Sequence, residues 1–350
     1  MQRKLVCIWL AAVSFVPAAA AQSNGCVPMT NQQLIIYRAG SLTRAFTKLV
    51  ATFTCQTGIT VKDNPMGSVD AGRQITAGGQ ACDLYAPADY LDIDLFFKPA
   101  GLADFNIVFA HGKMVLVYSA SSVAAKNLPI VAPGSPPFDP PASIPQAAAN
   151  WYAILTMPGV VIGGGHPFLD PGAYRADLIF QLAQEYYHVP NLYNNLLEHL
   201  AIPGPVRSGF TLGKQLDFQL SYEHNIRAMA SENPDMRYVN LPDEINLSDP
   251  AKDAWYREHA SIVLPGLGVP GSARTVKVPA ASVAWGITIL KKAPNPASAE
   301  KFLELLLGPT GRRVLEETGP APMDPPLVTP DDFRRLPQTL RPLVKMRGSA

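Results

Sequence analysis

Cysteine and histidine are scarce in this sequence, and neither forms a recognisable metal or catalytic motif. Four cysteines occur in 350 residues, and no two of them form a Cys-x-x-Cys pair. This absence argues against a thiolate zinc site or a redox motif. The six histidines are scattered without a His-Glu-x-x-His motif, and the chain has no Gly-x-Ser-x-Gly nucleophile elbow. We therefore expect neither a resident cofactor nor an enzyme.

An excess of charge of either sign is also missing. The first 21 residues carry two of the 29 basic residues and none of the 28 acidic ones, so the remaining chain has a formal charge of 27 − 28 = −1. Such a balance excludes a generally polybasic protein of the kind that binds nucleic acids or membrane surfaces. It is compatible with a local anion site.

Only one long apolar run occurs, and it lies at the N-terminus. Arg3 and Lys4 precede an apolar stretch over residues 5–16, which is too short for a membrane anchor, and small residues follow it up to Ala21. This pattern predicts a secretory signal peptide over residues 1–21 that is cleaved near Ala21. We therefore expect an exported protein.

Three cysteines remain after cleavage at that position, which permits at most one intramolecular disulfide. One hypothesis pairs Cys26 with Cys55, which would fasten the N-terminal segment to the first part of the fold. Other pairings stay open at this point.

Proline, in contrast, is abundant. The chain contains 34 prolines, and seven of them lie within the seventeen residues 129–145. That segment has no apolar periodicity. It predicts an extended surface loop.

Glycine–serine turns follow the first two predicted strands. The first unit has a strand at 34–37, the turn Gly40–Ser41 and a helix at 43–57. The second unit has a strand at 59–62, the turn Gly67–Ser68 and a helix at 71–76. Because carboxyl ends of parallel strands share one edge of a sheet, we expect both serine hydroxyls at the edge where ligands bind in open α/β sheets. Neither turn fits a Walker A or Gly-x-Gly-x-x-Gly pattern, so a nucleotide is not indicated.

A third glycine-rich loop, residues 163–169, leads to Asp170 and Pro171. These two residues are typical of an N-cap and a first helical residue, and apolar spacing continues a helix to about residue 187. A helix N-terminus carries free N–H groups and the positive end of the macrodipole, which suit an anion. Alone, the motif favours a well-capped helix. Together with the two upstream turns, it favours an anion site.

Seven stretches resemble the periplasmic molybdate/tungstate-binding proteins of ABC importers, in particular the tungstate-binding branch. Each stretch is short, but all seven occur in the family's order. They are residues 38–42, 67–71, 88–90, 150–155, 169–176, 241–247 and 292–296. The resemblance covers about residues 33–325.

The resemblance implies an α/β protein with the type II periplasmic-binding-protein fold, in which two α/β lobes joined by a hinge close on an oxyanion. The first lobe would contain residues 33–117 and 280–345, and the second would contain residues 118–279. The protein would capture molybdate or tungstate in the periplasm and deliver it to an ABC transporter permease. We expect it to act as a monomer without nucleic acid.

The resemblance also implies a set of ligand-binding residues. They are Gly40, Ser41, Gly67 and Ser68 in the first lobe, and Asp170, Ala173, Ser221, Tyr222 and Glu223 in the second. Ser41, Ser68 and Tyr222 would donate hydrogen bonds through their hydroxyls. Backbone amides near Asp170 and Ala173 would complete the site.

The family pattern differs from this sequence at one position. In the tungstate-binding branch, an aspartate matching Asp170 approaches the metal of the oxyanion, and a glutamate precedes the aromatic residue matching Tyr222. Ser221 occupies the glutamate position here, unless a small gap shifts Glu223 into it. The departure favours a four-oxygen tetrahedral site held by hydrogen bonds.

Two alternative functions stay open. The same donors suit sulfate, phosphate or another small oxyanion, and cavity size would then decide the substrate. A serine hydrolase would use Ser41 with a distant histidine, because triad members need not be close in sequence. We expect His166 and His224 beside the cleft rather than on the ligand, and Tyr174 and Arg175 in helix packing or in an ion pair between the lobes.

Overall fold

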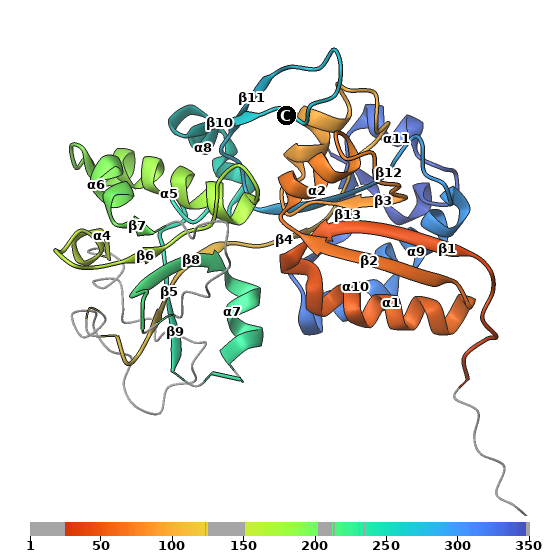
Figure 1. Cartoon of the computed structure of the whole chain (residues 1–350), viewed down its shortest axis with the longest axis horizontal. Helices are drawn as coiled ribbons and strands as arrows, with labels where there is room; N and C mark the ends of the chain where they lie inside the picture. Colours follow the sequence, from red (N-terminus) through yellow and green to blue (C-terminus); the bar gives the residue numbers. More distant parts are fainter. Residues whose placement is uncertain are drawn as a thin grey trace, which may run out of the picture.

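The computed structural model describes residues 25–122, 124, 151–201, 212, 214–230, 232–233 and 235–347. These residues form two α/β lobes that lie side by side, with strand β4 (Ile107–His111) leading from one to the other (Figure 1). The predicted signal peptide and the proline-rich segment 129–145 fall outside the described residues.

The first lobe is built on a seven-stranded mixed sheet with the strand order β14-β13-β4-β12-β3-β1-β2. Its other strands are β1 (Gln33–Ala39), β2 (Thr60–Met66), β3 (Leu84–Ala86), β12 (Ala284–Ile289), β13 (Ala321–Val328) and β14 (Lys345–Met346). β1 pairs in parallel with both β2 and β3, so the carboxyl ends of these three strands share one edge. Both glycine–serine turns lie at that edge, as the sequence predicted.

Helices pack on this sheet, with α1 and α10 on one face and α2 on the other (Figure 1). The helices and helical turns are η1 (Gly40–Leu42), α1 (Thr43–Thr57), α2 (Ser68–Ile75), η2 (Ile93–Phe97), α9 (Pro296–Leu307), α10 (Pro309–Thr318), α11 (Pro330–Arg335) and η5 (Arg341–Leu343). Phe46 and Phe53 recur at helical spacing in α1, and their rings lie 5.7 and 5.3 Å from that of Phe302. Helix α1 ends at Gly58, whose φ of 68° is the left-handed conformation common at helix ends. Its bounds confirm the sequence-based prediction.

The second lobe is built on a five-stranded sheet with the strand order β7-β6-β8-β5-β9. Its strands are β5 (Met114–Ser119), β6 (Ile162–Gly163), β7 (Leu200–Ala201), β8 (Phe218–Tyr222) and β9 (Met236–Asn240). Its helices are α4 (Trp151–Leu155), α5 (Pro171–Tyr187), α6 (Leu192–Glu198) and α7 (Glu223–Ala230). Most of the apolar face of α5 is buried, so this helix is held firmly with its N-terminus toward the first lobe (Figure 1).

The chain crosses between the lobes next to Gly112. Strand β5 pairs with β8 and β9, so it belongs to the second sheet, and the expected lobe boundary at residue 117 would cut it. The sheet pairing instead puts the crossing between β4 and β5. The returning segment 241–283 runs alongside: the Gly112 N–H donates to Val283 O (3.0 Å), and the Val283 N–H donates to Leu247 O (2.7 Å). Adjacent crossings of this kind form a hinge.

A two-stranded hairpin extends from the second lobe over the first (Figure 1). It consists of β10 (Ser261–Pro265) and β11 (Thr275–Pro279), and α8 (Asp253–His259) precedes it. At its base, Ser261 and Gln181 of α5 exchange two hydrogen bonds of 3.1 Å. At its tip, Leu267 O accepts a hydrogen bond of 2.7 Å from the Thr76 hydroxyl, beside α2. The segment assigned to the second lobe, 118–279, therefore also contacts the first lobe.

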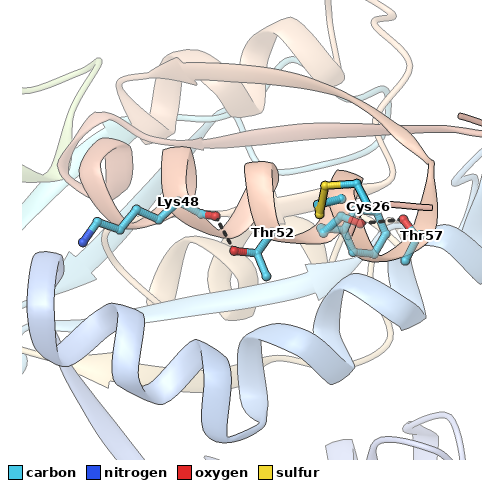
Figure 2. The surroundings of a disulfide bond; sticks show 6 residues. Cys26, Lys48, Thr52 and Thr57 are labelled. Atoms are coloured by element: carbon cyan, nitrogen blue, oxygen red, sulfur yellow. Dashed lines mark hydrogen bonds between the residues drawn. A yellow bond between two sulfur atoms is a disulfide. The ribbon is translucent and has the colours of Figure 1, made fainter. Parts of the chain in front are cut away.

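A disulfide joins Cys26 to Cys55 in the last turns of α1, with 4.4 Å between the two Cα atoms (Figure 2). The Val27 N–H donates to Cys55 O at 2.9 Å, so the backbone on both sides of the bond is also paired. Cys82 is buried with a free thiol. The structure thus confirms the hypothesis that this disulfide fastens the N-terminal segment to the first lobe.

Across the described ranges, we find no helix whose length and apolar character would allow it to cross a bilayer.

Candidate functional site

A cavity of about 260 Å³ lies between the two lobes. Pockets for drug-sized molecules typically measure about 300–1,000 Å³, so this one suits a smaller ligand. The first-lobe wall is Ala39, Gly40, Ser41 and Ala88, and the second-lobe wall is Gly163, Gly164, Gly165, Asp170, Gly172, Ala173, Ala176, Gln219, Leu220, Ser221, Tyr222 and Asn225. Six of the nine predicted ligand-binding residues line this cavity.

Ser41 follows β1 in the turn η1 and faces the cavity from the first lobe. Its hydroxyl oxygen accepts a hydrogen bond of 3.0 Å from the indole N–H of Trp285 on β12. An indole nitrogen can only donate, so the proton of the Ser41 hydroxyl remains available to a ligand. Gly40 beside it has open space where a side chain would be, which leaves its backbone accessible.

Ser68 and Gly67 lie next to the cavity but do not line it. Ser68 is 1% exposed, and its hydroxyl oxygen accepts a hydrogen bond of 2.9 Å from the Ala88 N–H. Gly67 is in contact with the opposite lobe, because an added Cβ would lie 2.4 Å from Leu169 O. In this conformation Ser68 supports Ala88, which does line the cavity.

The N-terminus of α5 forms the opposite wall. Asp170 is its N-cap, and its carboxylate accepts a hydrogen bond of 2.7 Å from the Gly172 N–H. The Ala173 N–H donates to Asp170 O at 3.1 Å. Burial raises the pKa of Asp170, while the Gly172 N–H and the charge of Arg175 oppose that rise. The cavity wall therefore combines the positive end of a helix with a carboxyl group that protonates more easily than usual.

Tyr222 ends β8 and brings a phenol to the cavity from the second lobe. Its hydroxyl oxygen accepts a hydrogen bond of 2.7 Å from Nη1 of Arg175. A guanidinium can only donate, so the Tyr222 proton points elsewhere. Burial raises the pKa of Tyr222, so the hydroxyl keeps this proton at neutral pH.

Ser221 lines the cavity, whereas Glu223 does not. Glu223 starts α7, and its carboxylate accepts a hydrogen bond of 2.8 Å from Arg227 and lies 3.4 Å from Lys113. It lines a separate crevice of about 600 Å³ between α7 and the end of α10. The structure thus places the side chain of Glu223 away from the other predicted ligand-binding residues.

A buried polar cluster joins the lobes beside the cavity. Arg175 of α5 donates a hydrogen bond of 2.9 Å to Ala88 O, and its Nη2 lies 3.3 Å from the carboxylate of Asp89. The Tyr174 hydroxyl donates to the same carboxylate at 2.7 Å. Of the two alternatives that the sequence left for Arg175, helix packing or an ion pair between the lobes, the structure has the ion pair, and its first-lobe partner is Asp89. Nearby Asp92 is buried without a hydrogen-bond partner for either carboxyl oxygen, and burial raises its pKa well above the usual value.

The sequence matches a protein family over residues 34–320, and the description of that family is bacterial extracellular solute-binding protein. The chain belongs to this family. In the part of this solute-binding protein that the structure describes, no group of three or more His, Cys, Asp or Glu side chains is arranged to hold a metal ion.

Relatives of this solute-binding protein confirm the resemblance drawn from its motifs. The molybdate/tungstate-binding protein WtpA of Thermococcus kodakarensis is 28% identical, over 94% of this chain and 94% of WtpA. An uncharacterized solute-binding protein of Methanoculleus marisnigri is 29% identical, over 97% of this chain and 98% of its own. The structure of the sulfate-binding protein SubI from Mycobacterium tuberculosis has a TM-score of 0.57 and 14% identity, covering 84% of this chain and 88% of SubI. That likeness confirms the two-lobe fold.

Sequence reasoning placed His224 of this solute-binding protein beside the cleft, but it missed Trp285 and the contacts that both residues make with Ser41. Trp285 reaches its hydroxyl, and His224 lies with Nε2 at 3.0 Å from its carbonyl oxygen. These contacts span 244 and 183 residues of sequence, and no local pattern signals them. His166 is exposed, and its ring nitrogen accepts from the Phe168 N–H within its own loop.

Proposed function

We propose that this protein captures molybdate or tungstate in the cavity between its lobes and delivers the oxyanion to an ABC transporter permease. It acts as a monomer in the periplasm after removal of residues 1–21. The lobe built on β1–β4 and β12–β14 supplies one set of donors, and the lobe built on β5–β9 supplies the other. The names of the WtpA relatives support the choice of oxyanion.

One observation carries this proposal: the hydroxyls of Ser41 and Tyr222 face one cavity from opposite lobes. Each hydroxyl oxygen accepts a hydrogen bond from a group that can only donate, the Trp285 indole or the Arg175 guanidinium. Both hydroxyl protons are therefore available to a ligand that accepts hydrogen bonds. A fully deprotonated tetrahedral oxyanion has only acceptors. Donors that are fixed before it arrives bind such an anion without further reorganisation.

The geometry favours a site in which the oxyanion keeps four oxygens. The carboxylate of Glu223 is engaged by Arg227 and Lys113 outside the cavity, so it is not available to the metal centre. Asp170 is the one predicted ligand-binding carboxyl group that lines the cavity. We propose that hydrogen bonds from Ser41, Tyr222 and the first turn of α5 hold the anion.

The contacts of Ser41 argue against the serine hydrolase alternative. A nucleophilic serine must give its proton to a neighbouring base. His224 is the histidine in contact with Ser41, but its ring nitrogen lies against the carbonyl oxygen, which can only accept. His224 is therefore the donor in this contact and not a base for the hydroxyl. We propose a binding protein without catalytic activity.

Calorimetric titration of the mature protein, residues 22–350, tests the proposal with molybdate, tungstate, sulfate and phosphate. We expect submicromolar binding of molybdate and tungstate and no measurable binding of the other two. Binding of sulfate or phosphate alone would overturn the substrate assignment. No binding by folded, ligand-free protein would overturn the oxyanion function as a whole.

A further inference from the structure

Three aromatic rings from both lobes pack together behind the cavity. We call Tyr222, His224 and Trp285 the aromatic cluster. The ring centroid of Trp285 lies 5.1 Å from that of Tyr222 and 5.1 Å from that of His224, and Tyr222 stacks on His224 at 5.9 Å. Trp285 belongs to the first lobe, and the other two residues belong to the second. The aromatic cluster therefore limits how closely the lobes approach one another at this point.

Trp285 is held rigidly within the first lobe. It is fully buried on β12, at a point where the pairing with β4 shifts in register. Gly112 lies against its ring, and a Cβ at that position would approach the indole to 3.0 Å. Because the indole is buried and closely packed, its N–H holds the Ser41 hydroxyl oxygen at 3.0 Å.

His224 fixes the same serine from the opposite lobe. Its Nε2–H donates to Ser41 O at 3.0 Å, which requires this nitrogen to carry a proton. Burial lowers the pKa of His224 to about 4, so the ring is neutral in this role at physiological pH. The main chain of Ser41 is thus tied to the second lobe, while its side chain is tied to the first.

We infer that the aromatic cluster sets the size of the anion that this protein selects, with Trp285 as the specificity-determining residue. The inference rests on the proposed function. Trp285 holds the Ser41 hydroxyl with its N–H. Its ring packs against the Tyr222 ring and so prevents Tyr222, on the other wall of the site, from moving closer to Ser41. The separation of the two hydroxyl donors is therefore fixed by the cluster and not by the ligand.

A fixed separation discriminates between anions that have the same charge and shape. Sulfate is smaller than tungstate, and in a rigid site it cannot contact donors on both walls at full strength. If Ser41 were free to rotate, its hydroxyl would follow the smaller anion. Rigid donors thus supply size selectivity that a flexible serine would lose.

The test measures the ratio of tungstate affinity to sulfate affinity, by calorimetry, in wild type and in Trp285→Phe. The substitution keeps an aromatic ring but removes the N–H. We expect tungstate binding to weaken about tenfold and sulfate binding to stay equal or improve, so that the ratio falls at least about tenfold. Trp255→Phe is the matched control, because Trp255 lies on α8 and its indole donates to Glu244 O, away from the cavity. The ratio of tungstate affinity to sulfate affinity in Trp255→Phe should equal that of wild type.

Three further variants show whether Trp285 acts through Ser41 and through lobe spacing. In a Ser41→Ala background, Trp285→Phe should change the ratio no further, since the group that it positions is gone. His224→Gln keeps an N–H donor and should retain the ratio, whereas His224→Leu should lower it. All ratios are compared only among variants that show a cooperative thermal transition.

The outcomes separate this inference from the proposed function. If wild type binds tungstate and Trp285→Phe keeps the wild-type ratio, the inference is wrong and the proposed function stands. If Trp285→Phe is unfolded, the His224→Gln and His224→Leu pair decides, and equal ratios in that pair contradict the inference. If wild type binds no oxyanion, both fail together.

Discussion

Arg175 on the second lobe forms a buried ion pair with Asp89 on the first, with 3.3 Å between Nη2 and Oδ2. The same guanidinium donates to the hydroxyl of Tyr222, which lines the cavity. One side chain therefore contacts the opposite lobe and a predicted ligand-binding residue. Arg175 therefore links a contact between the lobes to the position of the Tyr222 hydroxyl.

Replacing Asp89 with asparagine should destabilise the closed form. Removing one partner of a buried pair leaves an uncompensated charge, here that of Arg175, which typically costs about 3–5 kcal/mol. We expect weaker tungstate binding by calorimetry and a larger radius of gyration by X-ray scattering in the presence of tungstate. The control is Glu232→Gln, which removes the exposed ion pair between the lobes with Arg44 and should have little effect. Equal behaviour of the two variants would contradict a role for the buried pair in closure.

Ser41→Ala should reduce the binding of tungstate with little change in stability. The loss of one hydrogen bond to a charged ligand corresponds to about 1.5–3 kcal/mol. The measurements are calorimetric titration and denaturant unfolding of the same preparation.

Ser68→Ala, measured in the same way, should instead reduce stability. It leaves the Ala88 N–H buried without its acceptor, a change that costs about 1–3 kcal/mol. A variant of Ser68 that is fully stable but does not bind tungstate would show that Ser68 is itself a ligand-binding residue in the loaded protein.

Asp170→Asn should strengthen the binding of the oxyanion at neutral pH. Asparagine caps a helix about as well as aspartate, so α5 should keep its N-cap while the cavity loses a negative charge. Because burial raises the pKa of Asp170, wild-type affinity should rise as the pH falls through that pKa and the carboxylate becomes neutral. The variant should lack this dependence. Calorimetry at several pH values checks both points, and a large loss of tungstate affinity in the variant would show that Asp170 coordinates the metal centre.

Asp92→Asn should stabilise the protein at neutral pH. Burial raises the pKa of Asp92 in the folded state, so the folded protein binds a proton more tightly than the unfolded chain does. The contribution of protonated Asp92 to the free energy of unfolding is therefore fully present below a pH of about 4, the pKa of an aspartate in the unfolded chain. It is lost as the pH rises through the higher pKa that Asp92 has in the folded protein. The difference between variant and wild type should vanish in acid. Denaturant unfolding at acidic and neutral pH tests this, and an unstable variant at neutral pH would contradict it.

Local patterns were sufficient to predict the parts of the fold that hold Ser41 and Asp170. The first strand–turn–helix unit and the N-cap of α5 rest on glycine, proline and apolar spacing within a few residues, and the structure has them as predicted. The shared edge of β1 and β2 followed from the parallel pairing that such units adopt.

A short helix beside the cavity could not be predicted in this way. Helix α7 begins directly after Tyr222 and has only eight residues, too few for an apolar repeat to identify it. Its first turn carries Glu223 out of the cavity and brings His224 to Ser41. The contacts of Trp285 and Asp89 with distant residues likewise arise from tertiary packing, which a single sequence does not reveal.

The most direct measurement is anomalous diffraction from crystals of the mature protein grown with tungstate, because tungsten scatters anomalously and marks its own position. We predict one strong peak between the lobes, within hydrogen-bonding reach of the Ser41 and Tyr222 hydroxyls through the oxygens of the anion, with the carboxylate of Glu223 turned away. A peak in the crevice beside Glu223 and Arg227, or no peak between the lobes, would contradict the account.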